Sequence, residues 1–202
     1  MSTKMSGVLL AGGKSSRFET DKALAEFEDE ILIQRAVDLL KAVFDDVYVI
    51  VNPKDDYSFL EGVDIYNDLI PDCGPMGGIY TALKKSNTEY NFVMACDMPC
   101  LNQQFLDLLL AQPKDYDILV PIWEQKKEPL VAVYKKSCIP HFKKNLKENT
   151  FKIINIYPDV KVKKLPEAKI RANVSNSEYL FYNVNYKKDL AKIKEILAKK
   201  ES

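Results

Sequence analysis

The chain has 202 residues and 47% hydrophobic content, which is enough for one substantial core and short for two domains. Lysine plus arginine and aspartate plus glutamate both number 29, so the formal net charge is zero. This balance excludes a general electrostatic attraction to nucleic acid or to a membrane surface, and any anion site must be built locally. We expect one α/β domain over residues 1–202.

The first element is an apolar run at 8–10 that breaks into a loop rich in glycine and serine. The run has no polar alternation, which is typical of a strand covered on both faces. Gly12 and Gly13 let the backbone approach a ligand without interference from a Cβ atom, and the amides of such a loop suit phosphate. Positive charge around the loop comes from Lys14, Arg17 and Lys22. Arg17 can bind two phosphate oxygens at once, whereas a lysine acts as a point charge.

Two better-known glycine loops are excluded by spacing. A P-loop ending at Gly13-Lys14-Ser15 needs a glycine five positions before Gly13, where Val8 stands. A dinucleotide fingerprint needs Gly-x-Gly-x-x-Gly, but here two glycines are adjacent and none follows. A tight strand-to-helix turn with incidental lysines remains the alternative to an anion-binding loop.

The N-terminal residues form too short an apolar run for a signal-peptide core or a membrane span, so we expect a cytoplasmic protein without membrane contact. The chain has four cysteines, which are reduced in such a compartment. Three residues separate Cys96 from Cys100, and His141 is the only histidine. This arrangement disfavours a structural zinc site.

After the loop, strand-like and helix-like segments alternate. The segment 27–31 is predicted as a turn. Helices are predicted at 32–43, from about 77 to 84, 105–109, 137–149 and 190–197. Strands are predicted at 47–51, 63–66, 90–96, 117–123, 129–134 and 160–165, with 117–123 and 129–134 paired across a charged turn at 124–128. This order implies right-handed crossovers and a three-layer, Rossmann-like α/β fold, with a mainly parallel sheet and helices on both faces.

In such sheets ligands bind beyond the carboxyl ends of the strands. Asn52 and Asp97 each follow a predicted strand directly, and Asp68 follows a shorter one. A carboxylate that directly follows an apolar strand is partly desolvated, and a bound cation would explain the presence of Asp97 at this position. Mg²⁺ is typically held by one or two carboxylates together with phosphate oxygens. The alternatives are a helix cap or a turn with Pro99 for Asp97, and a plain turn for Asn52.

The order Leu10-Ala-Gly-Gly-Lys-Ser-Ser-Arg17, followed by Asp21-Lys22-Ala-Leu24, resembles the nucleotide-binding signature of the molybdenum cofactor guanylyltransferases, within the nucleotidyltransferase superfamily. Phe18-Glu19 stand where that family usually has Met-Gly. Asp97-Met-Pro-Cys-Leu101 resembles the family's Asp-x-Pro element after the metal-binding strand, and Gly74-Pro-Met-Gly-Gly78 resembles its Gly-Pro-Leu-x-Gly loop.

The resemblance implies a reaction in which a terminal phosphate of molybdopterin attacks the α-phosphorus of GTP. The products are the guanine dinucleotide cofactor and pyrophosphate. It implies that Asp97 binds Mg²⁺ and that Arg17 and Lys22 neutralise the phosphates as catalytic residues. The GTP contacts that it implies are Leu10, Ala11, Gly12, Gly13, Lys22, Asn52, Asp68 and Asp97. Transient contact with molybdoenzymes or other cofactor-biosynthesis proteins is also implied, without nucleic acid.

Two later segments concern the acceptor. Glu128-Pro-Leu-Val-Ala-Val-Tyr134 resembles the family's Pro-Leu strand, and Phe181-Tyr-Asn-Val-Asn185 resembles its Asn-x-Asn element, which places Asn183 and Asn185 on the acceptor side. The alternative is a strand end with a helix cap at Asn185. A cytidylyl- or sugar-phosphate nucleotidyltransferase and a non-catalytic nucleotide-binding protein remain alternatives. Gly12 argues against the former, because such relatives commonly carry Ala-Ala-Gly at this point.

Overall fold

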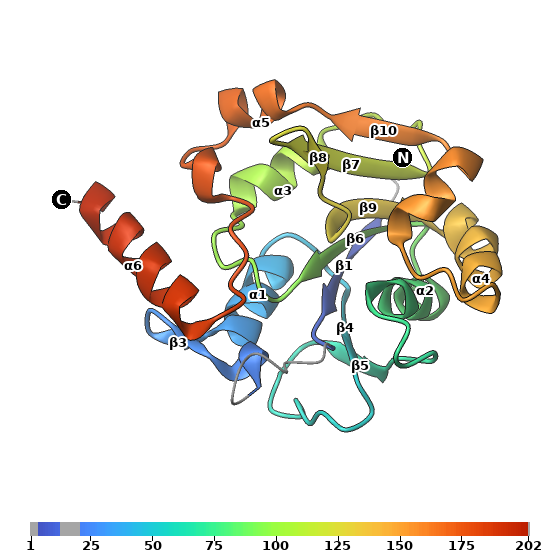
Figure 1. Ribbon diagram of the computed structural model, residues 1–202, viewed down its shortest axis with the longest axis horizontal. Helices are drawn as coiled ribbons and strands as arrows, with labels where there is room; N and C mark the ends of the chain where they lie inside the picture. Colours follow the sequence, from blue (N-terminus) through green and yellow to red (C-terminus); the bar gives the residue numbers. More distant parts are fainter. Residues whose placement is uncertain (1–3, 13–20, 202) are drawn as a thin grey trace.

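The computed structural model describes residues 4–12 and 21–201, in which strands and helices alternate (Figure 1). The strands are β1 (Met5–Leu10), β2 (Glu26–Phe27), β3 (Glu30–Ile31), β4 (Val47–Val51), β5 (Asp64–Asn67), β6 (Tyr90–Ala95), β7 (Ile118–Trp123), β8 (Lys126–Lys127), β9 (Val131–Lys135) and β10 (Val162–Leu165). The α-helices are α1 (Leu32–Lys41), α2 (Pro75–Lys85), α3 (Gln103–Leu110), α4 (Ile139–Lys147), α5 (Glu167–Asn173) and α6 (Lys187–Glu201). Short 3-10 helices are η1 (Lys22–Leu24), η2 (Lys136–Cys138), η3 (Ile153–Asp159) and η4 (Ser177–Tyr179).

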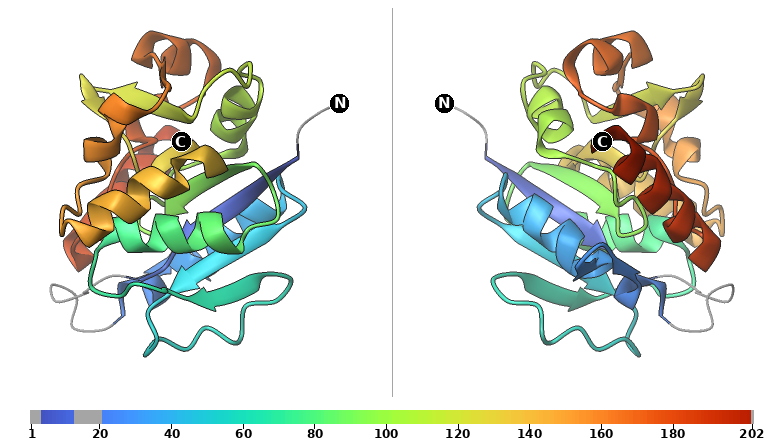
Figure 2. Two further views of the ribbon diagram at one scale, coloured as in Figure 1. Left: turned by 90° about the vertical axis from the view of Figure 1, so that its right-hand side faces the viewer. Right: turned by 90° about the vertical axis from the view of Figure 1, so that its left-hand side faces the viewer.

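Eight strands form one twisted sheet in the order β10-β7-β9-β6-β1-β4-β5, with β8 paired to β7. The pairs β1–β4, β1–β6, β4–β5 and β7–β10 are parallel, whereas β9 runs antiparallel to both of its neighbours. Helices cover both faces of this sheet (Figures 1 and 2). The predicted three-layer α/β fold with a mainly parallel sheet is therefore confirmed.

The central strands are buried on both faces because their side chains alternate between two apolar layers. Leu9 of β1 joins the layer that contains α1, α3 and α5, while Val8 and Leu10 face the layer of α2 and α4. Helix α1 contributes an apolar stripe with Ile33, Val37 and Leu40, spaced four and three residues apart. Continuous apolar runs in β1, β4 and β6 are thus the sequence pattern of a doubly covered sheet.

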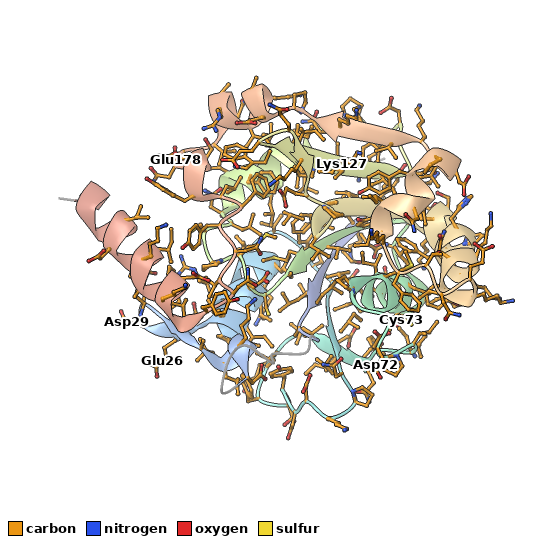
Figure 3. The ribbon with its side chains drawn as sticks, viewed as in Figure 1. Glu26, Asp29, Asp72, Cys73, Lys127 and Glu178 are labelled. Atoms are coloured by element: carbon orange, nitrogen blue, oxygen red, sulfur yellow. The ribbon has the colours of Figure 1, made fainter. Side chains whose placement is uncertain are left out.

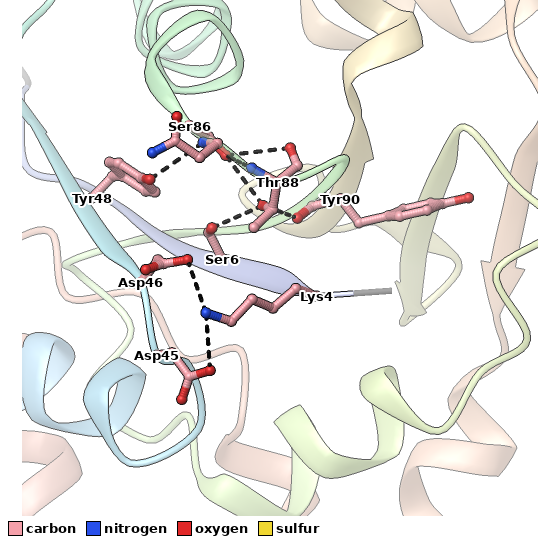
Figure 4. A network of polar contacts seen from close by, with 9 residues as sticks. Lys4, Ser6, Asp45, Asp46, Tyr48, Ser86, Thr88 and Tyr90 are labelled. Carbon is pink, nitrogen blue, oxygen red and sulfur yellow. Dashed lines mark hydrogen bonds and ion pairs between the residues drawn. The ribbon is translucent and has the colours of Figure 1, made fainter. Parts of the chain in front are cut away.

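A buried network of hydroxyl groups joins the amino ends of β1 and β6 (Figure 4). Ser6 and Thr88 share a hydrogen bond of 2.8 Å between their hydroxyl oxygens, and the Thr88 hydroxyl donates to the carbonyl of Tyr90 at 2.9 Å. Ser86 accepts from the Thr88 amide at 3.1 Å. Each bond adds only about 1 kcal/mol, but an unpaired buried hydroxyl is costly. The network therefore favours one register at this end of the sheet.

Several predicted boundaries differ from the structure. Helix α2 begins at Pro75 rather than near 77, because Gly74 has a φ of 60° and proline suits the first helical turn. The predicted turn in the segment 27–31 is present at 28–29, but it joins the short antiparallel strands β2 and β3, which were not predicted. The predicted turn at 124–128 contains β8, which folds back on β7 through Glu124 and Gln125, both with positive φ. No sequence pattern predicts η3 or α5.

The C-terminal segment returns to the middle of the molecule before α6 begins (Figure 1). A third apolar cluster joins α6 and the residues before it to β2 and α1; its buried members are Phe27, Leu32, Val184, Leu190 and Ile193. The thiols of the four cysteines are free. Within the described ranges, every helix is too short or too polar to cross a bilayer.

Candidate functional site

The carboxyl ends of four neighbouring strands gather the polar residues that the sequence singles out. The strands lie in the order β5-β4-β1-β6, so Asp68, Asn52, Gly12 and Asp97 follow one another along a single edge of the sheet. Backbone hydrogen bonds extend the ladder past the strand ends: the Asp68 amide donates to the carbonyl of Val51 at 2.8 Å. The fold therefore places these side chains at the edge that parallel sheets use for ligands.

A first cavity of about 350 Å³ lies between β1, β4, β5 and α2. Its floor is apolar and includes Leu10 and Ile50, while Asn52 and Asp68 supply polar groups. Gly78 of α2 packs so closely that a Cβ atom there would lie 3.1 Å from Leu10 Cδ2. The complete lining is Leu10, Gly12, Ile50, Val51, Asn52, Asp68, Asp72, Gly74, Pro75 and Gly78.

Gly12 is in close contact with Asn52. A Cβ atom on Gly12 would lie 2.9 Å from Asn52 Oδ1, although the backbone of Gly12 does not have the positive φ that only glycine favours. On its other side the Asn52 amide donates to Asp55 Oδ2 at 2.9 Å. The Asn52 amide thus occupies the space that a side chain at position 12 would need, and its hydrogen bond to Asp55 holds it there.

Asp68 ties the end of β5 to α2. Its Oδ1 accepts from the Thr81 hydroxyl at 2.7 Å and from the Ile70 amide at 3.0 Å, and the Thr81 hydroxyl accepts from the Leu69 amide. Burial raises the pKa of the Asp68 carboxyl, and the bonds from Ile70 and Thr81 oppose the shift. Because Oδ1 makes both bonds, Oδ2 is the oxygen left to act in the first cavity.

A second cavity of about 170 Å³ adjoins the first and contains an ion pair. Lys22 Nζ lies 2.7 Å from Asp97 Oδ2 and 3.3 Å from Asn185 Oδ1. The side chains of Lys22 and Asp97 are only 17% and 21% exposed. Asp97 Oδ1 is buried and has no hydrogen-bond partner in the described part of the chain. The Lys22 ammonium group thus contacts one oxygen of Asp97 and one of Asn185, while the second oxygen of Asp97 is left without a partner among the described residues.

The position of Lys22 is set by the short helix η1. Asp21 precedes this helix, and its Oδ1 accepts from the Ala23 amide at 3.0 Å. The other oxygen of Asp21 accepts from the hydroxyl of Tyr57, which is buried in the loop after β4. Sequence reasoning missed this anchor, because no local pattern relates a tyrosine in one loop to an aspartate in another.

The helix-cap alternatives for Asp97 and Asn185 find other residues in that role. Asn102, not Asp97, caps α3, since its side chain accepts from the Phe105 amide at 3.0 Å. Before α6, the Asp189 carboxylate accepts from the amides of Asn185 and Tyr186, both at 2.8 Å. The Asn185 side chain is therefore directed to Lys22 rather than to the helix end.

A third cavity of about 560 Å³ opens on the other side of Asn185. It is lined by Trp123, Glu124, Lys126, Glu128, Glu178, Phe181, Tyr182, Asn183, Asn185, Tyr186, Lys188 and Asp189. In Figure 3, Asp72 marks the first cavity and Glu178 the third, and the two lie on opposite sides of β1 and β6. The three cavities thus follow one another across the carboxyl edge.

Most of the predicted site residues are brought together. Leu10, Ala11, Gly12, Lys22, Asn52, Asp68 and Asp97 line the first two cavities, and Asn183 and Asn185 line the third. Gly13, Lys14 and Arg17 lie outside the described residues. Lys22 contacts a carboxylate, and the predicted contact with phosphate stays a prediction. Within residues 4–12 and 21–201, no three His, Cys, Asp or Glu side chains are grouped to hold a metal.

A family model described as a MobA-like NTP transferase domain matches residues 7–156. The chain belongs to the MobA-like NTP transferase family. This match includes the carboxyl ends of β1, β4, β5 and β6, whereas Asn183 and Asn185 lie beyond its end. The resemblance inferred from the loop at 10–24 is therefore confirmed.

Similar proteins agree with this assignment. A protein of Carboxydothermus hydrogenoformans, named a probable molybdenum cofactor guanylyltransferase, is 36% identical over 96% of this chain and 96% of its own length. A molybdenum cofactor guanylyltransferase of Desulfosudis oleivorans is 32% identical over 93% of each chain. The crystal structure of molybdopterin-guanine dinucleotide biosynthesis protein A from Archaeoglobus fulgidus has a TM-score of 0.82 at 23% identity, covering 96% of this chain and 99% of that one. At that identity the structural match shows the shared fold.

Proposed function

We propose that this protein is a molybdenum cofactor guanylyltransferase, which transfers GMP from GTP to molybdopterin and releases pyrophosphate. The names of the relatives that match nearly the whole chain support this reaction. The structural observation that carries it is the contact of Lys22 with Asp97 and Asn185, between a cavity on the nucleotide side and a cavity on the acceptor side. We also propose that residues 1–202 form one domain and that the protein is cytoplasmic. The four free thiols support the cytoplasmic location.

In this proposal GTP occupies the first two cavities. Asn52 and Asp68 contact the guanosine, and the Asp68 oxygen that makes no hydrogen bond within the described residues suits the N–H donors of the guanine edge. The backbone from Leu10 to Gly13 carries the nucleotide, since its glycines allow close approach. Lys22 and Arg17 neutralise the phosphates, for which their positive charge is suited.

The second cavity also fits a divalent cation. Asp97 Oδ1 is buried without a partner in the described residues, and the amide oxygen of Asn185 already faces a positive charge on Lys22. Hard cations such as Mg²⁺ prefer oxygen ligands and commonly bind through one carboxylate and substrate phosphates. Asp97 is the proposed ligand. Mg²⁺ bound there would neutralise part of the negative charge on the phosphate oxygens.

The chain's own residues act mainly by positioning charge. The attacking group is an ionised phosphate, which needs no general base, and His141 lies outside these cavities. Lys22 offsets the negative charge that develops during transfer, and a fixed ammonium in a half-buried site is more effective than one in water. Asn183 and Asn185 orient the acceptor from the far side of Lys22.

The decisive experiment is incubation with GTP, Mg²⁺ and a molybdopterin source, with pyrophosphate as the readout. We expect pyrophosphate only when both substrates are present. Release with CTP in place of GTP would favour a cytidylyltransferase. Gly12 argues against that alternative, because such relatives commonly carry alanine at this position. Binding of GTP without any release would favour a non-catalytic nucleotide-binding protein.

A further inference from the structure

Aromatic side chains form part of the wall of the third cavity. Trp123 of β7 and Phe181 lie with their ring centroids 5.3 Å apart, tilted by 48°, and Tyr182 follows on the same segment. Trp123 and Phe181 are only 7% and 9% exposed, and Arg171 Cζ lies 4.2 Å from the centroid of the Trp123 ring. The wall is therefore fixed by the core, and a ligand meets only a small part of each ring. Aromatic and apolar walls with a few placed polar groups are typical of small-molecule sites.

Glu128 is a half-buried carboxylate in this cavity. Its backbone is fixed, because its amide donates to the carbonyl of Pro121 and its carbonyl accepts from the amide of Val131. No hydrogen bond to its carboxylate is found in the described part of the chain. Burial raises the pKa of Glu128, which Lys126 opposes and Glu124 reinforces. The carboxylate thus carries a desolvation cost that a ligand with N–H donors would offset.

Three other acids on the cavity wall, Glu124, Glu178 and Asp189, differ from Glu128. Glu178 is exposed to solvent. Glu124 is exposed to solvent at the tip of the hairpin between β7 and β8. Asp189 already accepts from two backbone amides at the start of α6. Glu128 therefore combines partial burial with free hydrogen-bonding capacity, a pair of properties that none of these three neighbours combines.

The cavity is joined to the ion pair from two sides. Asn185 lines it and also contacts Lys22. Leu130, two residues after Glu128, lines the second cavity, and its carbonyl accepts from the Ala95 amide beside Asp97 at 3.1 Å. A ligand with a phosphate near Lys22 can therefore extend past Asn185 toward Glu128.

We propose that the Glu128 carboxylate binds the N–H edge of the pterin ring of the acceptor, with Trp123 and Phe181 along the ring. This inference rests on the proposed function, because it takes molybdopterin as the acceptor. A pterin presents an amino group next to a ring N–H, and these two donors match the two oxygens of one carboxylate. Guanine has the same edge, so the test must separate the two rings.

The binding test uses Trp123, which is the only tryptophan in the chain and lies in the cavity wall. Titration with free pterin should quench its fluorescence, and guanosine should do so only at much higher concentration. Glu128→Gln replaces one oxygen by an amino group that faces the ring's donors, so we expect pterin affinity to fall by about tenfold or more. Glu89→Gln makes the same change at an exposed site before β6 and should leave the titration unchanged.

Equal pterin affinity in the wild type and in Glu128→Gln would overturn the proposal, as would equal quenching by guanosine and pterin. Glu128→Asp, which keeps the charge, and melting curves of each variant exclude a folding defect as the cause. In the transfer assay, Glu128→Gln should raise the KM for molybdopterin and leave the KM for GTP unchanged. If the wild type releases no pyrophosphate, the proposed function fails, while the titration still tests the pterin site independently.

Discussion

The side-chain oxygens around Lys22 explain why a carboxylate follows the apolar strand β6. Asp97 is neither the cap of α3 nor exposed, and one of its oxygens has no partner among the described residues. Leaving a carboxylate oxygen buried without a hydrogen bond is costly, and a cation bound to the carboxylate would offset that cost. Lys22 supplies one positive charge, and the proposed Mg²⁺ supplies another.

We predict that Asp97→Asn lowers transfer by about 100-fold or more, because the amide keeps the shape but removes the charge that binds the metal. GTP should still raise the melting temperature, since Asn52, Asp68 and Lys22 remain. The measurement is pyrophosphate release against Mg²⁺ concentration. Asp115→Asn serves as the control, because Asp115 pairs with Lys163 at the surface. Near wild-type rates for Asp97→Asn would remove Asp97 from the metal site.

A second residue-scale prediction concerns Gly12. In Gly12→Ala the new methyl group meets Asn52 Oδ1 at 2.9 Å, so the Asn52 amide must move away from Asp55. We expect a loss of about 1 kcal/mol in the free energy of unfolding, from one hydrogen bond. The melting-temperature shift with GTP should fall more than the shifts with ATP or CTP, because ligand stabilisation follows affinity.

The control for Gly12→Ala is Gly62→Ala, at a glycine with a φ of 71° that lies outside the cavities. Alanine at that φ is strained, so about 1 kcal/mol of stability should be lost as well. The order of the three nucleotides should then stay as in the wild type. If Gly12→Ala keeps the wild-type preference for GTP, the contact with Asn52 does not select the base.

At the scale of elements, β5 and α2 depend on each other through Asp68 and Thr81. The pKa of the folded Asp68 carboxyl is raised by burial, so this group contributes stability below its unfolded pKa of about 3.9. That contribution is lost as the pH rises through the folded value. Asp68→Asn keeps an oxygen for Thr81 and Ile70, and it has no charge to desolvate.

We therefore predict that Asp68→Asn is more stable than the wild type at pH 7, and that this difference disappears as the pH falls toward about 4. Urea unfolding of both proteins across this range measures the effect. GTP affinity should fall at pH 7, since an amino group replaces an oxygen in the first cavity. A stability difference that is constant with pH would contradict burial of the charge.

The elements that could be predicted from the sequence are those with continuous or periodic apolar patterns. β1, β4, β6 and α1 were identifiable because burial on two faces or along one stripe leaves a direct pattern. β8 was missed because its turn uses positive φ at residues that are not glycine. Such a turn is stabilised by the strand pairing between β7 and β8 that it allows, and the local sequence does not predict this pairing.

At the scale of the whole molecule, the site is assembled from segments far apart in the chain. The strand ends could be predicted to meet at one edge, which placed Asn52, Asp68 and Asp97 together. The contact of Lys22 with Asn185, 163 residues away, depends on how the C-terminal segment crosses the sheet edge. The Val184 amide fixes that crossing by donating to the carbonyl of Asp97 at 2.9 Å. Neither contact leaves a trace in local sequence.

The cluster under α6 should therefore control the acceptor side of the site. Ile193 is fully buried, and Ile193→Ala should lower the free energy of unfolding by about 2–4 kcal/mol through lost burial and a cavity. Because α6 holds Asn185 through Asp189, we expect transfer to fall while the melting-temperature shift with GTP remains. The control is Ile154→Ala, at a residue of η3 that is 48% exposed, where the change should stay within about 0.5 kcal/mol. Urea unfolding and pyrophosphate release on both variants make the comparison. A loss in Ile193→Ala no larger than in Ile154→Ala would show that α6 does not support the site.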